Sequence, residues 1–298
     1  MRVLSPAGAY VLAHPGAFAS KVLSGFKKNQ GLLLAGAVAY YALLSVVPLL
    51  ILVVIALSHW VDQGELLSTL GRYLEWIVPG QSKPIVAELA NFVQHQSYIG
   101  WVLLVTMLFF SSLAFTVLEK AMSVIFLHRF AVRRRHFLVS ALLPYCYILS
   151  LGFGLLVMTF VSGGIQAMAQ DRILFLGGEW SLQGVSGVLL YLLGLAGEVM
   201  LLTSIYMVMP VGRLWWRHAL VGGVTAAVLW ELSRRVLVWY FATLSKVSVV
   251  YGSLTTAIVV LFSLEIAATL LLLGAQVISD YEQIDRASGR AGARLPPQ

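Results

Sequence analysis

The feature that most constrains this chain is an uninterrupted apolar segment from Leu32 to Leu57, which contains no charged residue. About 20 apolar residues in an α-helix are enough to cross the hydrocarbon core of a lipid bilayer. Only 11% of the residues are charged and 59% are hydrophobic, whereas a soluble globular protein carries about 25% charged residues. The composition therefore excludes a soluble globular domain and indicates an integral membrane protein.

Five further stretches are long and apolar enough to span a bilayer. They cover Gly100–Leu118, Phe137–Val161, Gly184–Met209, Ala219–Phe241 and Gly252–Ile278. The mean hydropathy of +0.87 over the whole chain agrees with this interpretation. The sequence therefore predicts an all-α, polytopic membrane protein with six transmembrane helices.

The distribution of lysine and arginine predicts how the spans are oriented. Positive residues collect in cytoplasmic loops. Most of them lie before span one, between spans two and three, between spans four and five, or after span six. Both termini are therefore expected in the cytoplasm. The predicted domains are a cytoplasmic N-terminal segment (1–30), a six-helix transmembrane domain (31–279) and a flexible cytoplasmic tail (280–298).

The densest positive cluster lies between spans two and three. It consists of Arg129, Arg133, Arg134 and Arg135. Its first expected role is to anchor the topology, because the positive-inside rule already accounts for it. The same arginines are also suited to binding anionic lipid headgroups of the inner leaflet.

The N-terminal segment carries an amphipathic pattern. Phe18, Val22, Leu23 and Phe26 share one helical face, and lysines lie opposite to it. This pattern is typical of a helix that lies in the membrane interface, with its apolar side toward the acyl chains.

The first outer loop, residues 58–99, is predicted to contain two short amphipathic helices. Helical periodicity runs over residues 65–78, stops at a Pro-Gly pair, and resumes at Pro84. These helices either cap the bundle or rest on lipid headgroups as a packing device.

Charged side chains inside the predicted spans are the candidate functional residues. Spans four, five and six each contain one glutamate: Glu198, Glu231 and Glu265. Each lies roughly 18–21 Å into its span by helical rise. A lipid-facing charge at that depth costs at least about 2.5–3.5 kcal/mol. The three carboxylates are therefore expected to face partners or water in the interior of the bundle.

Two arginines follow Glu231 in the same span. Arg234 and Arg235 lie three and four residues after it, so both can reach it along the helix surface. Because they differ by about 100° in direction, one guanidinium is expected to meet Glu198, Glu265 or the anionic group of a ligand. Three interpretations stay open. They are a polar cavity for substrate or protons, a buried ion-pair network that fixes helix register, and arginines that snorkel to the outer headgroups.

Proline and glycine predict local features of the spans. Pro48 lies well inside span one, where it removes a backbone hydrogen bond and favours a helix kink. Ser45 is near enough in sequence to bond the backbone that the proline frees. Gly194 and Gly197 in span four predict the close approach of a neighbouring helix.

No pattern in the sequence supports a metal site, a cofactor or catalysis. The six histidines show no paired ligand spacing, Cys146 is the single cysteine, and HExxH, CxxC and Walker A patterns are absent. We therefore expect no metal, no cofactor and no enzymatic activity. Because membrane orientation explains the net charge of +7, nucleic acid is not an expected partner.

Motifs that extend from about Phe26 to Tyr281 suggest a family. They are the segment 39–50 (AYYALLSVVPLL), Trp230-Glu231-Leu232 together with Tyr251-Gly252-Ser253-Leu254, and Leu272-Leu273-Gly274-Ala275. In these motifs the chain resembles the YihY/BrkB family of inner-membrane proteins, once labelled ribonuclease BN. The resemblance implies six spans, cytoplasmic ends and a place in the bacterial inner membrane.

The chain departs from the family pattern at two positions. Gln276 occupies a position where the family usually has Glu, and Glu265 lies in a stretch that is normally apolar or aromatic in relatives. The old nuclease label has no support in the residues. Phosphodiester hydrolysis needs a metal cluster or an acid–base set, and the histidines on the inner side form neither.

The intramembrane charges lead to a functional hypothesis. We expect a transporter or exporter that moves an amphipathic or anionic substrate, in one version a lipid-related one, through a polar site in the membrane. The expected partners are membrane lipids and the transported substrate, and a homo-oligomer is compatible with this hypothesis. The alternative is a non-transporting membrane scaffold or envelope-maintenance protein that docks lipids or partners.

Overall fold

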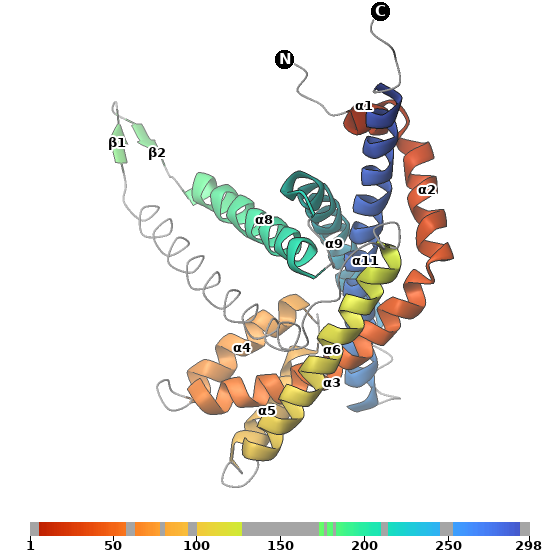
Figure 1. Cartoon of the computed structure of the whole chain (residues 1–298). Helices are drawn as coiled ribbons and strands as arrows, with labels where there is room; N and C mark the ends of the chain where they lie inside the picture. Colours follow the sequence, from red (N-terminus) through yellow and green to blue (C-terminus); the bar gives the residue numbers. More distant parts are fainter. Residues whose placement is uncertain are drawn as a thin grey trace, which may run out of the picture.

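The computed structural model describes residues 6–57, 63–77, 81–94, 100–126, 173–175, 178–180, 183–209, 214–244 and 253–292. Within these ranges the regular structure is helical apart from one short hairpin (Figure 1). The helices are α1 (Pro6–Ala13), α2 (Pro15–Lys28), α3 (Gly31–Leu57), α4 (Gln63–Ile77), α5 (Ser82–Gln94), α6 (Gly100–Ile125), α8 (Gln183–Val208), α9 (Trp216–Leu244) and α11 (Ser253–Gly292).

The hairpin is a small local exception within an otherwise helical structure that agrees with the all-α prediction. Strands β1 (Ile173–Phe175) and β2 (Gly178–Trp180) pair antiparallel, with Ile173 opposite Trp180. Their apolar and aromatic residues favour strand geometry. Strands of three residues are too short to be recognised by the length and hydropathy criteria that identify spans.

Three helices contain segments long and apolar enough to cross a membrane. These segments are Leu104–Ile125 in α6, Tyr191–Val208 in α8 and Thr256–Ala287 in α11. A fourth results if α2 and α3, which meet at a bend of 64°, form one broken span. The described part of the chain therefore contains three or four candidate spans.

The sequence predicts six spans, and two of them account for much of the difference. The predicted third span, Phe137–Val161, lies outside the described residues, as do Arg129 and Arg133, Arg134 and Arg135. The predicted fifth span corresponds to α9, which is helical over Trp216–Leu244 but is not among the candidates. Glu231, Arg234 and Arg235 interrupt its apolar run.

A sharp bend joins α2 to α3. The Asn29 N–H donates to the carbonyl of Gly25 at 2.9 Å, and Gln30 adopts a left-handed φ of 54°. The ring of Phe26 packs so closely over Gly31 that any Cβ at this position would collide with it. The bend therefore folds α2 back against the bundle and makes glycine necessary at position 31.

The amphipathic face predicted for α2 is only partly buried. Val22 and Phe26 are buried, whereas Leu23 is exposed. Phe26 belongs to the main apolar core, and α2 contacts both α3 and α11. The α2 helix therefore packs against protein on this side.

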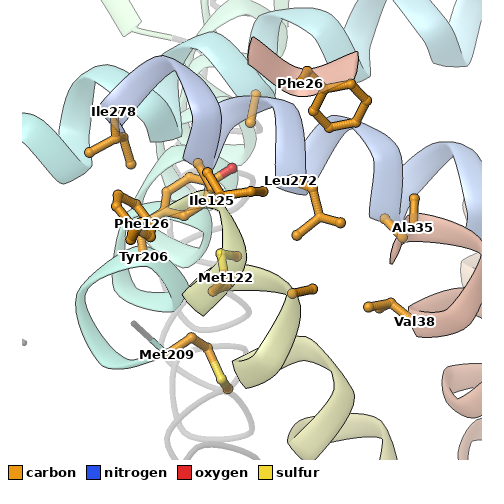
Figure 2. Close-up of a cluster of buried hydrophobic side chains, with 14 of the residues drawn as sticks. Phe26, Ala35, Val38, Met122, Ile125, Phe126, Tyr206, Met209, Leu272 and Ile278 are labelled. Atoms are coloured by element: carbon orange, nitrogen blue, oxygen red, sulfur yellow. The ribbon is translucent and has the colours of Figure 1, made fainter. Parts of the chain in front are cut away.

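The main core lies where six helices meet (Figure 2). Its members come from α2, α3, α6, α8, α9 and α11, and include Phe26, Val38, Met122, Ile125, Tyr206, Met209, Ala226, Leu272 and Ile278. Two hydrogen bonds cross it. The Tyr206 hydroxyl donates to the carbonyl of Leu271 at 2.7 Å, and the Ser279 hydroxyl donates to the carbonyl of Ile125 at 3.0 Å. These two buried hydroxyls are thus bonded to the backbone of neighbouring segments.

Helices α4 and α5 form where the sequence predicts two short helices. They pack on the end of α3 through a second apolar cluster of Ile51, Leu74 and Leu89. The Thr256 hydroxyl near the start of α11 donates to the side-chain oxygen of Gln81 at 2.7 Å. Helix α1 contacts α11 at the opposite end (Figure 1), which we call the terminal end. With 40 residues, α11 is about 60 Å long and connects the two ends.

The last turns of α11 differ from the predicted tail. The helix continues to Gly292, so residues 280–292 are helical, where a flexible segment is predicted from residue 280. Asp280 and Glu282 are buried, and the Arg286 guanidinium donates to Glu282 at 3.2 Å. Packing against α1 and α2 and this i,i+4 pair explain why the helix does not end with the apolar run.

Candidate functional site

The centre of the candidate site is an ion pair within α9. The Arg234 Nη2 atom donates to Glu231 Oε1 and Oε2, each at 2.9 Å, and Arg234 Nε donates to Oε2 at 3.2 Å. Arg235 Nη2 lies 3.7 Å from Glu231 Oε1, and the Arg235 side chain is 73% exposed. The pair that the sequence predicts thus forms mainly through Arg234, while Arg235 makes a longer and mostly exposed contact with the same carboxylate.

A tyrosine from the neighbouring helix completes this arrangement. The Tyr191 hydroxyl on α8 donates to Glu231 Oε1 at 3.1 Å. Sequence analysis did not identify this residue. A hydroxyl in the apolar run of the predicted span four was the available signal, because a phenol among apolar residues needs a hydrogen-bond partner.

Glu198 lies on α8 two helical turns after Tyr191, close enough to Glu231 and Arg234 for electrostatic interaction. Its Oε1 atom is buried and has no hydrogen-bond partner among the described residues. The structure thus brings Glu198, Glu231 and Arg234 together between α8 and α9. The site thus holds the carboxyl groups of Glu198 and Glu231, and Arg234 donates to that of Glu231.

Glu265 faces a different helix. Its Oε1 atom lies 3.9 Å from the position that a Cβ at Gly36 of α3 would occupy. Helix α11 contacts both α3 and α9, so Glu265 is on the α3 side of the bundle. Of the five predicted site residues, the described contacts join Glu198, Glu231, Arg234 and Arg235, and they place Glu265 apart.

The hydrogen bond that Ser45 was predicted to supply to the backbone freed by Pro48 is not formed in α3. Pro48 is buried inside a helix that runs over Gly31–Leu57. The Ser45 hydroxyl donates to the carbonyl of Ala42 at 2.9 Å, whereas the carbonyl that Pro48 leaves without its helical donor is that of Leu44. Ser45 therefore does not compensate for the proline, and the kink stays a prediction.

Gly194, one of the two glycines predicted to allow close helix packing, does not do so, whereas glycines of α9 and α11 do. A Cβ at Gly194 would meet nothing within 4 Å. A Cβ at Gly222 or Gly274 would collide with Ile278 or Tyr206, respectively. The close approaches therefore lie where α9 packs against α11 and where Tyr206 of α8 packs against α11.

A second polar cluster lies at the terminal end and was not predicted. The Asn29 side-chain amide donates to Gln276 Oε1 at 2.9 Å, and Gln276 Nε2 donates to Asp280 Oδ2 at 2.9 Å. Lys21 Nζ lies 3.7 Å from Asp280 Oδ1. The spacing of Gln276 and Asp280, four residues apart on a helix, was the available signal. This cluster attaches α2 to α11.

His218 and Asp285 link α9 to the same end of α11. His218 Nε2 lies 3.6 Å from Asp285 Oδ2, and the imidazole packs edge-on against Trp215 and Tyr281. Among the described residues there is no group of three His, Cys, Asp or Glu side chains that could hold a metal ion. The arrangement is therefore an interhelical contact between an imidazole and a carboxylate.

Comparison with known proteins gives one family and several relatives. The family model described as virulence factor BrkB matches residues 22–295. A UPF0761 membrane protein of Alkalilimnicola ehrlichii is 27% identical over 256 residues, covering 86% of this chain and 56% of the relative. One from Pseudomonas aeruginosa is 29% identical over 255 residues, covering 82% and 57%. One from Aggregatibacter aphrophilus is 24% identical over 253 residues, covering 85% and 87%.

The chain thus spans only a little over half the length of the first two of these relatives. No solved structure matches it significantly.

Proposed function

This chain belongs to the virulence factor BrkB family, and on that premise we propose that it is a transporter or exporter of the bacterial inner membrane. Its substrate is a lipid-related molecule that is either amphipathic or anionic. This substrate passes through a polar site within the membrane. The proposal includes no catalytic step, no cofactor and no metal. Its curated relatives are named as membrane proteins, and transport is our inference for this chain.

The observation that carries the proposal is the state of Glu198. Its buried Oε1 atom lacks a partner among the described residues, beside an ion pair that is already complete. A buried carboxyl oxygen at lipid depth without a hydrogen-bond partner is energetically costly, and a purely structural network would have no reason to retain it. A polar group that is available in the membrane is suited to bind a substrate or a proton.

The site favours a substrate with two kinds of polar group. An acidic group of the substrate would compete with Glu231 for the planar guanidinium of Arg234. A hydroxyl or ammonium group would donate to Glu198. Tyr191 adds a hydroxyl that holds Glu231 from the side of α8. A molecule with an anionic headgroup and apolar remainder matches this combination.

The proposed topology has six spans with both termini in the cytoplasm. The terminal end is then the cytoplasmic end, and the α4–α5 pair lies on the outer side. The charge distribution supports this orientation. The length of α11 supports it too, since this helix connects α5 at one end to α1 at the other.

The test is a flux assay in proteoliposomes of phosphatidylcholine and phosphatidylglycerol. Two probes cover the substrate classes: carboxyfluorescein trapped inside, and fluorescent phosphatidylglycerol whose outer-leaflet fraction is bleached by dithionite. We expect Glu198→Gln, Glu231→Gln and Arg234→Ala to abolish the flux of at least one probe that the wild type moves. Circular dichroism and gel filtration report whether each variant is folded. Undiminished flux in all three variants contradicts the proposal.

A scaffold is the second candidate, and one observation favours it. Glu231 and Arg234 satisfy each other, as expected for an ion pair that only fixes helix register. If the protein is a scaffold, the wild-type chain will transport neither carboxyfluorescein nor fluorescent phosphatidylglycerol. The Glu198, Glu231 and Arg234 variants would then change stability and partner binding alone.

A further inference from the structure

Helix α9 exposes a continuous stripe of side chains. Leu232, Arg235, Val236 and Trp239 are all exposed, and Val228 extends the stripe by one turn. Their spacing of three and four residues places them on one face of the helix. The face is apolar except for one guanidinium.

Arg235 is the one cation on this stripe, and among the described residues its charge is only partly compensated. Both oxygens of Glu231 accept bonds from Arg234 at 2.9 Å, and Tyr191 adds a bond to Oε1. Arg235 approaches the same carboxylate only to 3.7 Å. Glu231 is also the only acidic residue in the sequence of α9. The outward side of Arg235 therefore has positive potential and several donors directed at the surroundings.

In the proposed six-span topology, Arg235 lies near the outer end of the fifth span, below the headgroups. Arg235 precedes the end of the predicted span, Phe241, by six residues, which is about 9 Å of helical rise. Trp239 and Tyr240 follow within one to two turns and are exposed. Such aromatic residues are typical of the membrane–water interface. A long arginine side chain can extend from this depth to the phosphate level.

We propose that this face of α9 is a binding site for an anionic phospholipid. The phosphate is bound by the Arg235 guanidinium, Trp239 lies beside the headgroup, and Leu232 and Val236 contact one acyl chain. The absence of an exposed carboxylate on α9 disfavours the ammonium group of a zwitterionic lipid. This inference rests on the proposed function only in placing α9 across the membrane, and it does not require transport.

The experiment measures lipid retention by the full-length chain. The purified protein is equilibrated in nanodiscs of equal parts phosphatidylglycerol and phosphatidylcholine, released, and examined by native mass spectrometry. We expect the wild type to retain phosphatidylglycerol in preference to phosphatidylcholine. We expect Arg235→Gln to lower that preference roughly tenfold, as for the loss of a charge-assisted hydrogen bond. Arg235→Lys should lower it less, because it keeps the charge but loses the planar fork.

Arg286→Gln is the matched control. Arg286 also follows a glutamate by four residues and is half exposed, but it lies at the terminal end. Its substitution should leave the lipid preference unchanged. An unchanged preference in Arg235→Gln, or an equal loss in both glutamine variants, overturns the proposal.

A spin label at Leu232→Cys, in a Cys146→Ser background, separates this proposal from the placement of α9. A spin label that faces lipid is relaxed more strongly by molecular oxygen than by a water-soluble nickel complex. If the label faces lipid while Arg235→Gln keeps its preference, only the lipid site is wrong. If the label faces water, the span placement fails, and the lipid site fails with it.

Discussion

The side-chain amide of Asn29 donates to Gln276 Oε1 at 2.9 Å and so joins the α2–α3 bend to the buried part of α11. Gln276 in turn donates to Asp280 at 2.9 Å. An amide can accept from one neighbour and donate to the other, whereas an ionised carboxylate can only accept. Gln276 can therefore bridge Asn29 and Asp280, at a position where the YihY/BrkB family usually has glutamate.

The first prediction concerns this amide. Gln276→Glu would place two carboxylates side by side in a position that is only 3% exposed. We expect it to destabilise the folded chain by about 1–3 kcal/mol, because Asp280 loses its buried donor. Thermal unfolding in detergent measures the change. The double variant Gln276→Glu/Asp280→Asn restores a donor–acceptor pair and should recover most of the loss. No recovery would show that the hydrogen bond is not the cause.

The second prediction concerns the contact between α2 and α11. A Cβ at Gly25 would lie 2.6 Å from Gln276 Nε2. Gly25→Ala should therefore destabilise by roughly 1–3 kcal/mol through overpacking. Gly16 lies in the same helix with nothing within 4 Å. Gly16→Ala should be neutral or slightly stabilising, and equal melting temperatures for the two variants would contradict this account of the contact.

The third prediction separates the two arginines of α9. Arg234→Gln should destabilise by about 1–3 kcal/mol, since Glu231 loses most of its bonds in a largely buried position. Arg235→Gln should change stability by less than about 1 kcal/mol, because its side chain is mostly exposed. The two variants are heated in parallel, and gel filtration measures the fraction of each that stays folded. A larger loss for Arg235 would reverse the assignment of partners.

The fourth prediction concerns Tyr191. Tyr191→Phe removes the hydroxyl that bonds Glu231 at 3.1 Å and leaves the ring in place. We expect reduced flux of the transported probe in proteoliposomes with a stability loss of about 0.5–1.5 kcal/mol. Tyr240→Phe on α9, also exposed, serves as the control. Equal flux in both variants and the wild type would remove Tyr191 from the site.

The fifth prediction concerns topology. In a Cys146→Ser background, single cysteines are introduced at the exposed positions Lys27, Lys83 and Arg286. A membrane-impermeant maleimide should label Lys83→Cys in intact cells. It should label Lys27→Cys and Arg286→Cys only after permeabilisation. Labelling of Lys27→Cys and Arg286→Cys under different conditions would mean an odd number of spans.

Most of the described helices could be predicted from the sequence because their signals are local. The apolar runs at Leu32–Leu57 and Gly184–Met209 agree to within one residue with α3 and α8. The Glu231–Arg234 pair was equally predictable, since residues three apart on a helix are neighbours. The extension of α11 to Gly292 was missed, because its stability depends on contacts with α1 and α2 that no local pattern reveals.

By itself the sequence indicated a helical membrane protein with carboxylates and guanidiniums inside long apolar segments, because hydropathy and the cost of a buried charge belong to each segment alone. Only the tertiary structure decided which of these groups meet. It placed Glu198 beside Glu231, turned Glu265 toward Gly36 and left Arg235 facing outward. The rotation of each helix about its axis is set by side chains packed between segments far apart in the chain. That choice is made by the core around Tyr206, Leu272 and Ile278.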